Sequence, residues 1–122
     1  MEKLSPQLRH QVVQFQQAQQ HAQILLSQRQ QIELLLKETE RAIEELEKLP
    51  EDAVVYKSVG TLLVRSEKST LQKNLTEQKE TLDLRVKTLQ RQEERAVQRL
   101  REMRDKIDGA LKGKEPSEGA GS

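Results

Sequence analysis

A regular spacing of apolar residues along two stretches, which contain no internal glycine or proline before Gly109, constrains this chain more than any other feature. In each stretch, steps of alternately three and four residues connect one apolar residue with the next. Nine of twelve such positions are apolar in the first stretch and nine of eleven in the second, which is typical of a coiled-coil seam. We call these the seam positions: Leu8, Gln11, Phe15, Ala18, Ala22, Leu25, Arg29, Ile32, Leu36, Thr39, Ile43 and Leu46, then Leu75, Lys79, Leu82, Val86, Leu89, Glu93, Ala96, Leu100, Met103, Ile107 and Ala110.

The composition agrees with a coiled coil and not with a conventional globular core. Hydrophobic residues make up 34% of the 122 residues and aromatic residues 2%, which is too little large apolar surface for such a core. Another 34% are charged, a combination that also suits disorder. The sustained period of apolar residues favours helices over disorder, because a coiled coil needs only two apolar positions in seven.

The sequence predicts a mainly α-helical fold, a long antiparallel two-helix coiled coil formed by a single chain. Ser5 and Pro6 are typical of a helix start, since serine caps helices and proline fits the first turn. We expect one domain, 1–112, with helices at 5–49 and 69–111, each roughly 65 Å long. Folding back pairs residues whose numbers add to about 116. Residues 113–122 have the composition of a linker, and we expect a disordered tail.

The link between the helices has the period of a β-hairpin, which we expect at residues 53–66. Residues 54–59 and 62–65 are rich in β-branched and aliphatic side chains, with Gly60 between them. We predict that Gly60 takes the first central position of a type II′ turn. A turn centred on Val59 and Gly60 would push a β-branched residue towards positive φ.

The apolar side chains of this hairpin predict an obligate oligomer. A lone two-stranded hairpin is marginally stable in water, and both of its edges would stay unpaired. Strands from several chains can join edge to edge and bury their faces in an intersubunit β-barrel. The alternative is that the hairpin folds over the end of the coiled coil. We predict the assembly residues to be Val54, Val55, Tyr56, Val59, Gly60, Leu62, Leu63 and Val64.

The outer ends of the two helices predict a second apolar surface. Helix ends fray, and no further segment is expected to cover them. Such surface marks an interaction site, and methionine and leucine on a mobile element suit varied apolar partners. The alternative, which we prefer for Leu8, Leu100 and Met103, is that these residues close the seam. We predict the binding residues of these tips to be Leu4, Leu8, Val12, Val13, Met103, Ile107 and Leu111.

Charge and motifs argue against several classes of function. The 21 basic and 20 acidic residues are interspersed, without the basic face of a nucleic-acid binder. The sequence has no phosphate loop, hydrolase or metalloprotease motif, so we predict no enzyme, catalytic residue or cofactor. His10 and His21 lack the spacing of metal ligands, and we expect no metal site. With no cysteine and no apolar run of about 20 residues, we expect a cytoplasmic protein without a membrane span.

Specific segments resemble the prefoldin family, and the resemblance covers about residues 5–111. They are Val12 to Gln20 in the first helix, Val55 to Arg65 at the bend, and Leu82 to Leu89 with Arg91 to Arg95 in the second helix. The bend sequence VYKSxG between two seams is more specific than the heptads. The link has room for one hairpin, which resembles the β class of the family, whereas the α class has two.

The resemblance implies an α2β4 heterohexamer whose hairpins form an intersubunit β-barrel. It implies an ATP-independent co-chaperone subunit that captures non-native proteins at the coiled-coil tips and passes them to a group II chaperonin. The implied partners are a prefoldin α subunit, further β subunits, non-native client proteins and the chaperonin, but neither nucleic acid nor membrane. The alternative is a structural or tethering coiled coil that binds one defined partner, for which an apolar hairpin is not needed.

Overall fold

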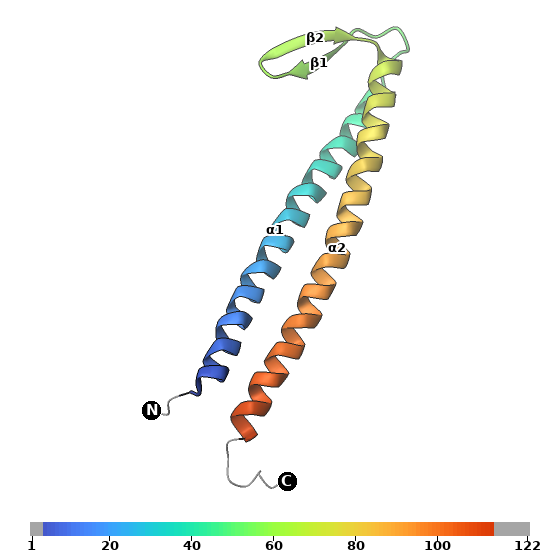
Figure 1. The fold of residues 1–122 in the computed structure, drawn as a ribbon. Coiled ribbons are helices and arrows are strands. Elements are labelled where there is room, and N and C mark those ends of the chain that lie inside the picture. The colour runs from blue at the N-terminus through green and yellow to red at the C-terminus, as the bar shows by residue number, and fades with distance from the viewer. Residues whose placement is uncertain (1–3, 114–122) are drawn as a thin grey trace. The chain divides into compact units, whose positions relative to one another are not determined.

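The computed structural model describes residues 4–113, which are mainly helical (Figure 1). Helix α1, Pro6–Glu47, is followed by strand β1, Val55–Val59, strand β2, Leu62–Ser66, and helix α2, Lys68–Gly113. The seam and the link predicted two long helices with a two-stranded antiparallel β-hairpin between them. Both predictions are confirmed.

Helix α1 begins where the sequence predicts, because Ser5 caps it. The backbone N–H of Leu8 donates to Oγ of Ser5 at 3.0 Å, and the N–H of Arg9 donates to the Ser5 carbonyl oxygen at 2.9 Å. Pro6 takes the first helical position, where an N–H would lack an intrahelical partner. The residues that follow contain no glycine and are mostly strong helix formers, so the helix continues without a break.

The other helix ends differ from the predicted ends by a few residues. Helix α1 ends at Glu47 instead of residue 49, and a tighter turn follows in which the N–H of Leu49 donates to the carbonyl oxygen of Leu46 at 3.1 Å. Helix α2 begins at Lys68, one residue early, and continues to Gly113 instead of ending at residue 111. Gly113, the first residue of the predicted tail, is therefore helical. The rest of that tail lies outside the described residues.

The chain divides into two compact units. One, which we call the hairpin unit, is residues 29–88 and contains the second part of α1, the β-hairpin and the first part of α2. The other, which we call the terminal unit, combines the first part of α1 with the last part of α2. Its described residues are 4–28 and 89–113. Each unit therefore contains one segment from each helix.

The interior of the hairpin unit is formed by seam positions from both helices. Each seam position from residue 29 to residue 86 is buried or half-buried. A continuous apolar stripe on each helix produces this pattern, because only one side of each helix turns towards its partner. The buried apolar members are Ile32, Leu46, Leu82 and Val86.

Contacts across the two helical segments give the hairpin unit an antiparallel register. Nε2 of Gln78 donates to Oγ1 of Thr39 at 3.2 Å, and Nζ of Lys79 lies 3.7 Å from Oε2 of Glu40. The residue numbers of each pair add to slightly more than the predicted value. Thr39 is buried, and its hydroxyl also donates to the carbonyl oxygen of Leu35 at 2.9 Å. The hydroxyl therefore both donates and accepts, as a buried hydroxyl requires.

A buried lysine closes the bend between the helices. Lys68 is 5% exposed, its Nζ donates to the carbonyl oxygen of Leu49 at 2.7 Å, and it lies 3.4 Å from Oε1 of Glu51. The carbonyl groups at the end of a helix lack intrahelical partners, and a cation is favoured there. Lys68 therefore ties the end of α1 to the start of α2.

The β-hairpin has the predicted two-residue turn. Val59 pairs with Leu62, which leaves Gly60 at the first central position with a φ of 59°. A type II′ turn requires a positive φ at this position, and glycine adopts it at little cost. Strand β1 begins at Val55 instead of residue 53, and the hairpin ends at residue 66 as expected, where Ser66 pairs with Val55.

The terminal unit also uses the predicted seam. Leu8, Leu25 and Leu89 are buried, and the other seam positions of this unit are half-buried except Ala110, which is exposed. In the antiparallel register, Ala110 lies opposite the first turn of α1, which begins at Pro6. Little of α1 is therefore left to cover Ala110. The seam therefore loses its cover at the end of α2.

Candidate functional site

The β-hairpin presents two faces of different chemistry. Successive side chains of a strand point to opposite faces, and residues paired across two strands share a face. One face combines most of the aliphatic side chains, and we call it the aliphatic face. It contains Val55, Lys57, Val59, Leu62, Val64 and Ser66, whereas the opposite face contains Tyr56, Ser58, Leu63 and Arg65.

Most large apolar side chains of the hairpin are exposed. Leu62 and Leu63 are 65% and 72% exposed, and Tyr56, Val59 and Val64 are about half exposed. Apolar side chains that gather on one surface mark an interaction site. The sheet contains β1 and β2 alone, so within residues 4–113 each strand has one edge without a strand partner. An open edge beside an apolar face is what strand addition by another chain requires.

Two of the predicted assembly residues differ from the rest. Val55 is 7% exposed, so it already packs within the hairpin unit. Val54 is 54% exposed but precedes β1. Gly60 forms the turn, and the other predicted assembly residues lie in the two strands, where their exposed side chains are available to a neighbouring chain.

The predicted tip residues all belong to the terminal unit, but their exposures differ. Val13 and Leu111 are 48% and 46% exposed. Leu8 is 3% exposed, which agrees with the alternative that it closes the seam. The half-buried members of the set are Leu4, Val12, Met103 and Ile107.

A groove that the seam pattern did not predict runs along the terminal unit. It lies between residues 16–26 of α1 and residues 93–100 of α2, with a volume of about 980 Å³. Its lining includes Ile24 and Val97, which are 55% and 41% exposed. Neither is a seam position. The sequence signal for them is that the apolar stripe is wider than the seam itself. A search for apolar residues directly beside the seam positions would find both.

The polar seam residues of the hairpin unit form ion pairs on its surface. Nη1 of Arg29 lies 2.9 Å from Oε1 of Glu33 one turn along α1, and Lys79 lies 3.7 Å from Glu40 of the other helix. All four side chains are partly exposed, so each pair contributes little to stability. The pair between Lys79 and Glu40 joins the two helices, so it influences which register they adopt.

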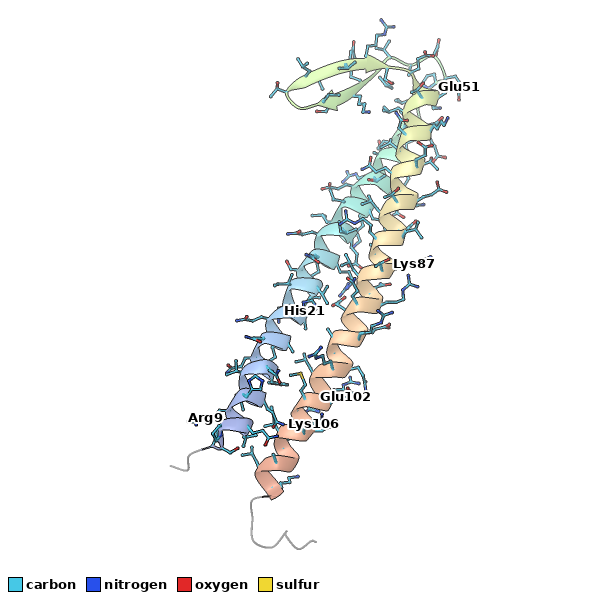
Figure 2. All side chains as sticks on the ribbon, viewed as in Figure 1. Arg9, His21, Glu51, Lys87, Glu102 and Lys106 are labelled. Atoms are coloured by element: carbon cyan, nitrogen blue, oxygen red, sulfur yellow. The ribbon has the colours of Figure 1, made fainter. Side chains whose placement is uncertain are left out.

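The described part of the chain contains no arrangement typical of a metal site. Among residues 4–113, no group of three or more His, Cys, Asp or Glu is placed to hold a metal ion. His10 and His21 are both exposed on α1, where His21 is labelled in Figure 2. No helix within these residues is long and apolar enough to cross a membrane.

Comparison with known proteins gives matches over nearly the whole chain. A family model described as prefoldin subunit matches residues 9–114. A prefoldin subunit beta of Methanothrix thermoacetophila is 51% identical over 108 residues, which are 88% of this chain and 90% of that protein. A prefoldin subunit beta of Archaeoglobus fulgidus is 47% identical over 111 residues, which are 91% of this chain and 96% of that protein.

A solved structure agrees with these sequence matches. The crystal structure of the prefoldin beta subunit from Thermococcus strain KS-1 is similar with a TM-score of 0.82 and 40% identity. The similarity covers 91% of this chain and 97% of that chain, including both helices and the single hairpin. The chain therefore belongs to the prefoldin subunit family, in its β class.

Proposed function

We propose that this chain is the β subunit of an α2β4 heterohexamer that holds non-native proteins without ATP and delivers them to a group II chaperonin. Membership of the prefoldin family gives the chain a co-chaperone role. The observation that supports the proposal most is the apolar hairpin, because Leu62 and Leu63 are 65% and 72% exposed in the single chain. The cytoplasmic location expected from the sequence belongs to the same proposal.

The hairpin is the assembly element in this proposal. Each hairpin has two open edges, so neighbouring hairpins can add on both sides and close into a barrel. The aliphatic face suits the interior of that barrel, since Val59, Leu62 and Val64 lie together there, and Lys57, its one charged residue, can extend its ammonium group towards the rim. The opposite face carries Ser58 and Arg65 and suits the outside.

The terminal unit supplies the client-binding tips in this proposal. Val13 and Leu111 are about half exposed, and Met103 and Ile107 are half-buried next to the ends of the helices. Side chains of this kind become accessible when helix ends fray. Apolar contact is non-directional, so it suits clients that have in common only their exposed apolar surface.

The proposal is tested with the full-length chain assembled with a prefoldin α subunit. The assembled complex is expected to suppress the aggregation of reduced insulin, measured by light scattering without nucleotide. Trimming residues 1–8 and 108–122 is expected to reduce this suppression and leave the native mass of the complex unchanged. Addition of a group II chaperonin is expected to remove a fluorescent client from the complex.

Two results contradict the proposal in different ways. A correctly assembled complex that suppresses no aggregation contradicts the chaperone role and favours the tethering alternative. A trimmed chain that no longer assembles shows that the tips are structural, so the client-binding residues are then misassigned.

A further inference from the structure

We infer that the groove of the terminal unit is a second client-binding site, which holds a short extended apolar segment of a non-native protein. The inference rests on the proposed function and places client contacts away from the helix ends. The groove has an apolar part and an amide part, both contributed by residues 16–26 and 93–100. The apolar part consists of Ala22, Ile24, Leu26, Val97 and Leu100.

The amide part of the groove offers hydrogen bonds to a bound backbone. Gln16, Gln19, Gln20 and Gln23 line it, and within residues 4–113 the structure shows no hydrogen bond from their side chains to other protein groups. Each side-chain amide has two N–H donors and one carbonyl acceptor. An extended segment has free backbone N–H and C=O groups that need partners when they leave water. The glutamines can therefore bind the backbone of a segment whatever its sequence.

The combination of the two parts favours an extended segment over a helix. A helix satisfies its backbone groups internally and would cover the glutamine amides without giving them partners, which is costly. In an extended segment, alternate side chains point the same way. Every second side chain can then contact the apolar part while the backbone between them faces the amides.

The length of the groove sets the length of the segment. Residues 16–26 of α1 span about 15 Å along the helix axis. An extended chain advances about 3.3 Å per residue, so the groove holds about five residues. The volume of about 980 Å³ lies at the upper end of the range of typical ligand pockets, which is enough for such a segment.

The lining of the groove fits an uncharged segment, although the α2 segment beside it carries many charged residues outside the lining. Within residues 4–28, Arg9 is the only Lys, Arg, Asp or Glu. Glu93 is the one charged residue among those that line the groove. Burying a charge against apolar groups costs several kcal/mol unless a partner is supplied. The groove therefore complements neutral apolar segments, which a folded protein buries and a non-native protein exposes.

The main test compares two matched pairs of substitutions in the full-length chain assembled with a prefoldin α subunit. Ile24→Gln with Val97→Gln removes the two most exposed apolar side chains of the groove and leaves the seam intact. The control is Leu34→Gln with Leu84→Gln, which are 58% and 65% exposed in the hairpin unit. The probe is a fluorescein-labelled nine-residue peptide in which leucine and serine alternate. Fluorescence anisotropy is expected to show about a tenfold higher Kd for the groove pair and no change for the control pair.

Two further measurements test the geometry of binding. A peptide of the same composition with its leucines at helical spacing is expected to bind more weakly than the alternating peptide. The chain contains no cysteine, so Gln20→Cys can be labelled with a benzophenone maleimide. Irradiation is expected to cross-link this position to the alternating peptide and to reduced insulin.

The outcomes separate this inference from the proposed function. An unchanged Kd for the groove pair, together with lost suppression after the tips are trimmed, refutes the groove and leaves the proposed function standing. An equal loss of peptide affinity in the control pair also refutes the groove, because any exposed apolar side chain would then bind the peptide. Cross-links from Gln20→Cys to another copy of this chain assign the groove to self-association instead. An unmodified complex that suppresses no aggregation overturns both.

Discussion

Leu62→Asp is expected to abolish assembly of the chain with its partner subunits while leaving its own fold intact. Leu62 is 65% exposed on the aliphatic face, so a polar side chain is tolerated there in the single chain. Its cross-strand partner is Val59, which offers no charge to pair with a carboxylate. Val64 lies opposite Lys57 instead, so Val64→Asp places its carboxylate next to a cation.

The size of the effect follows from the exposure of Leu62. Full burial of a leucine side chain stabilises by about 1.5–3 kcal/mol, so covering the exposed part of Leu62 contributes about 1–2 kcal/mol to assembly. An unpaired carboxylate in the same surroundings costs several kcal/mol more. Together they weaken association by about 4 kcal/mol or more for each chain, which is about a thousandfold. The pair with Lys57 offsets up to about 1 kcal/mol of this cost in Val64→Asp.

The assay is sedimentation velocity of each variant mixed with a prefoldin α subunit, over a dilution series. Circular dichroism checks that helix content is unchanged. Leu84→Asp is the control, because Leu84 is equally exposed but lies on α2, outside the hairpin. We expect the order of assembly strength to be unmodified chain and control, then Val64→Asp, then Leu62→Asp. If Leu62→Asp assembles at the same concentration as the unmodified chain, the aliphatic face is not buried between subunits and the reasoning is wrong.

Three further predictions concern the stability of the hairpin unit. Lys68→Met is expected to lower the free energy of unfolding by about 1.5–3 kcal/mol, because it removes a charge-assisted hydrogen bond to the carbonyl oxygen of Leu49. Glu51→Gln is expected to have little effect on the free energy of unfolding, because the Glu51 side chain is 83% exposed. Equal urea midpoints for Lys68→Met and Glu51→Gln would contradict the stabilising role of the hydrogen bond from Lys68 to Leu49. Gly60→Ala is expected to cost about 1–2 kcal/mol through its positive φ alone, seen as a lower thermal midpoint, since open space surrounds the position. Leu82→Ala, at a buried seam position, is expected to cost about 2–5 kcal/mol in guanidinium unfolding.

The elements of this fold were predictable from sequence because each has a strong local cause. Ser5 caps α1 through a hydrogen bond to the third residue of the helix, and such a cap needs only neighbouring residues. Gly60 has the φ that its turn demands, for a reason that is again local. The seam pattern identified the buried side of each helix because the period of apolar residues matches the helical period.

The contacts that sequence could not predict join residues far apart in the chain. Lys68 is buried because the carbonyl oxygen of Leu49 lies beside it, and no local pattern distinguishes it from a solvated lysine. Val55 was predicted as an assembly residue from its apolar character, but it is already covered within its own unit. Periodicity shows which side of an element is apolar, whereas the identity of the covering group depends on tertiary packing.

The distribution of charge along α1 supports the proposal that its first part is a binding surface and more than a spacer. The hairpin unit contains eleven basic and twelve acidic residues, and among them Lys79 pairs with Glu40 across the two helices, which favours one register. Within 4–28, by contrast, the chain has no acidic residue and one arginine, and glutamine takes most of the remaining polar positions. A spacer has no need to give up register-fixing ion pairs over six turns of helix. A surface that must accept unrelated apolar segments benefits from having few charges, because each fixed charge would weaken the binding of some of these segments.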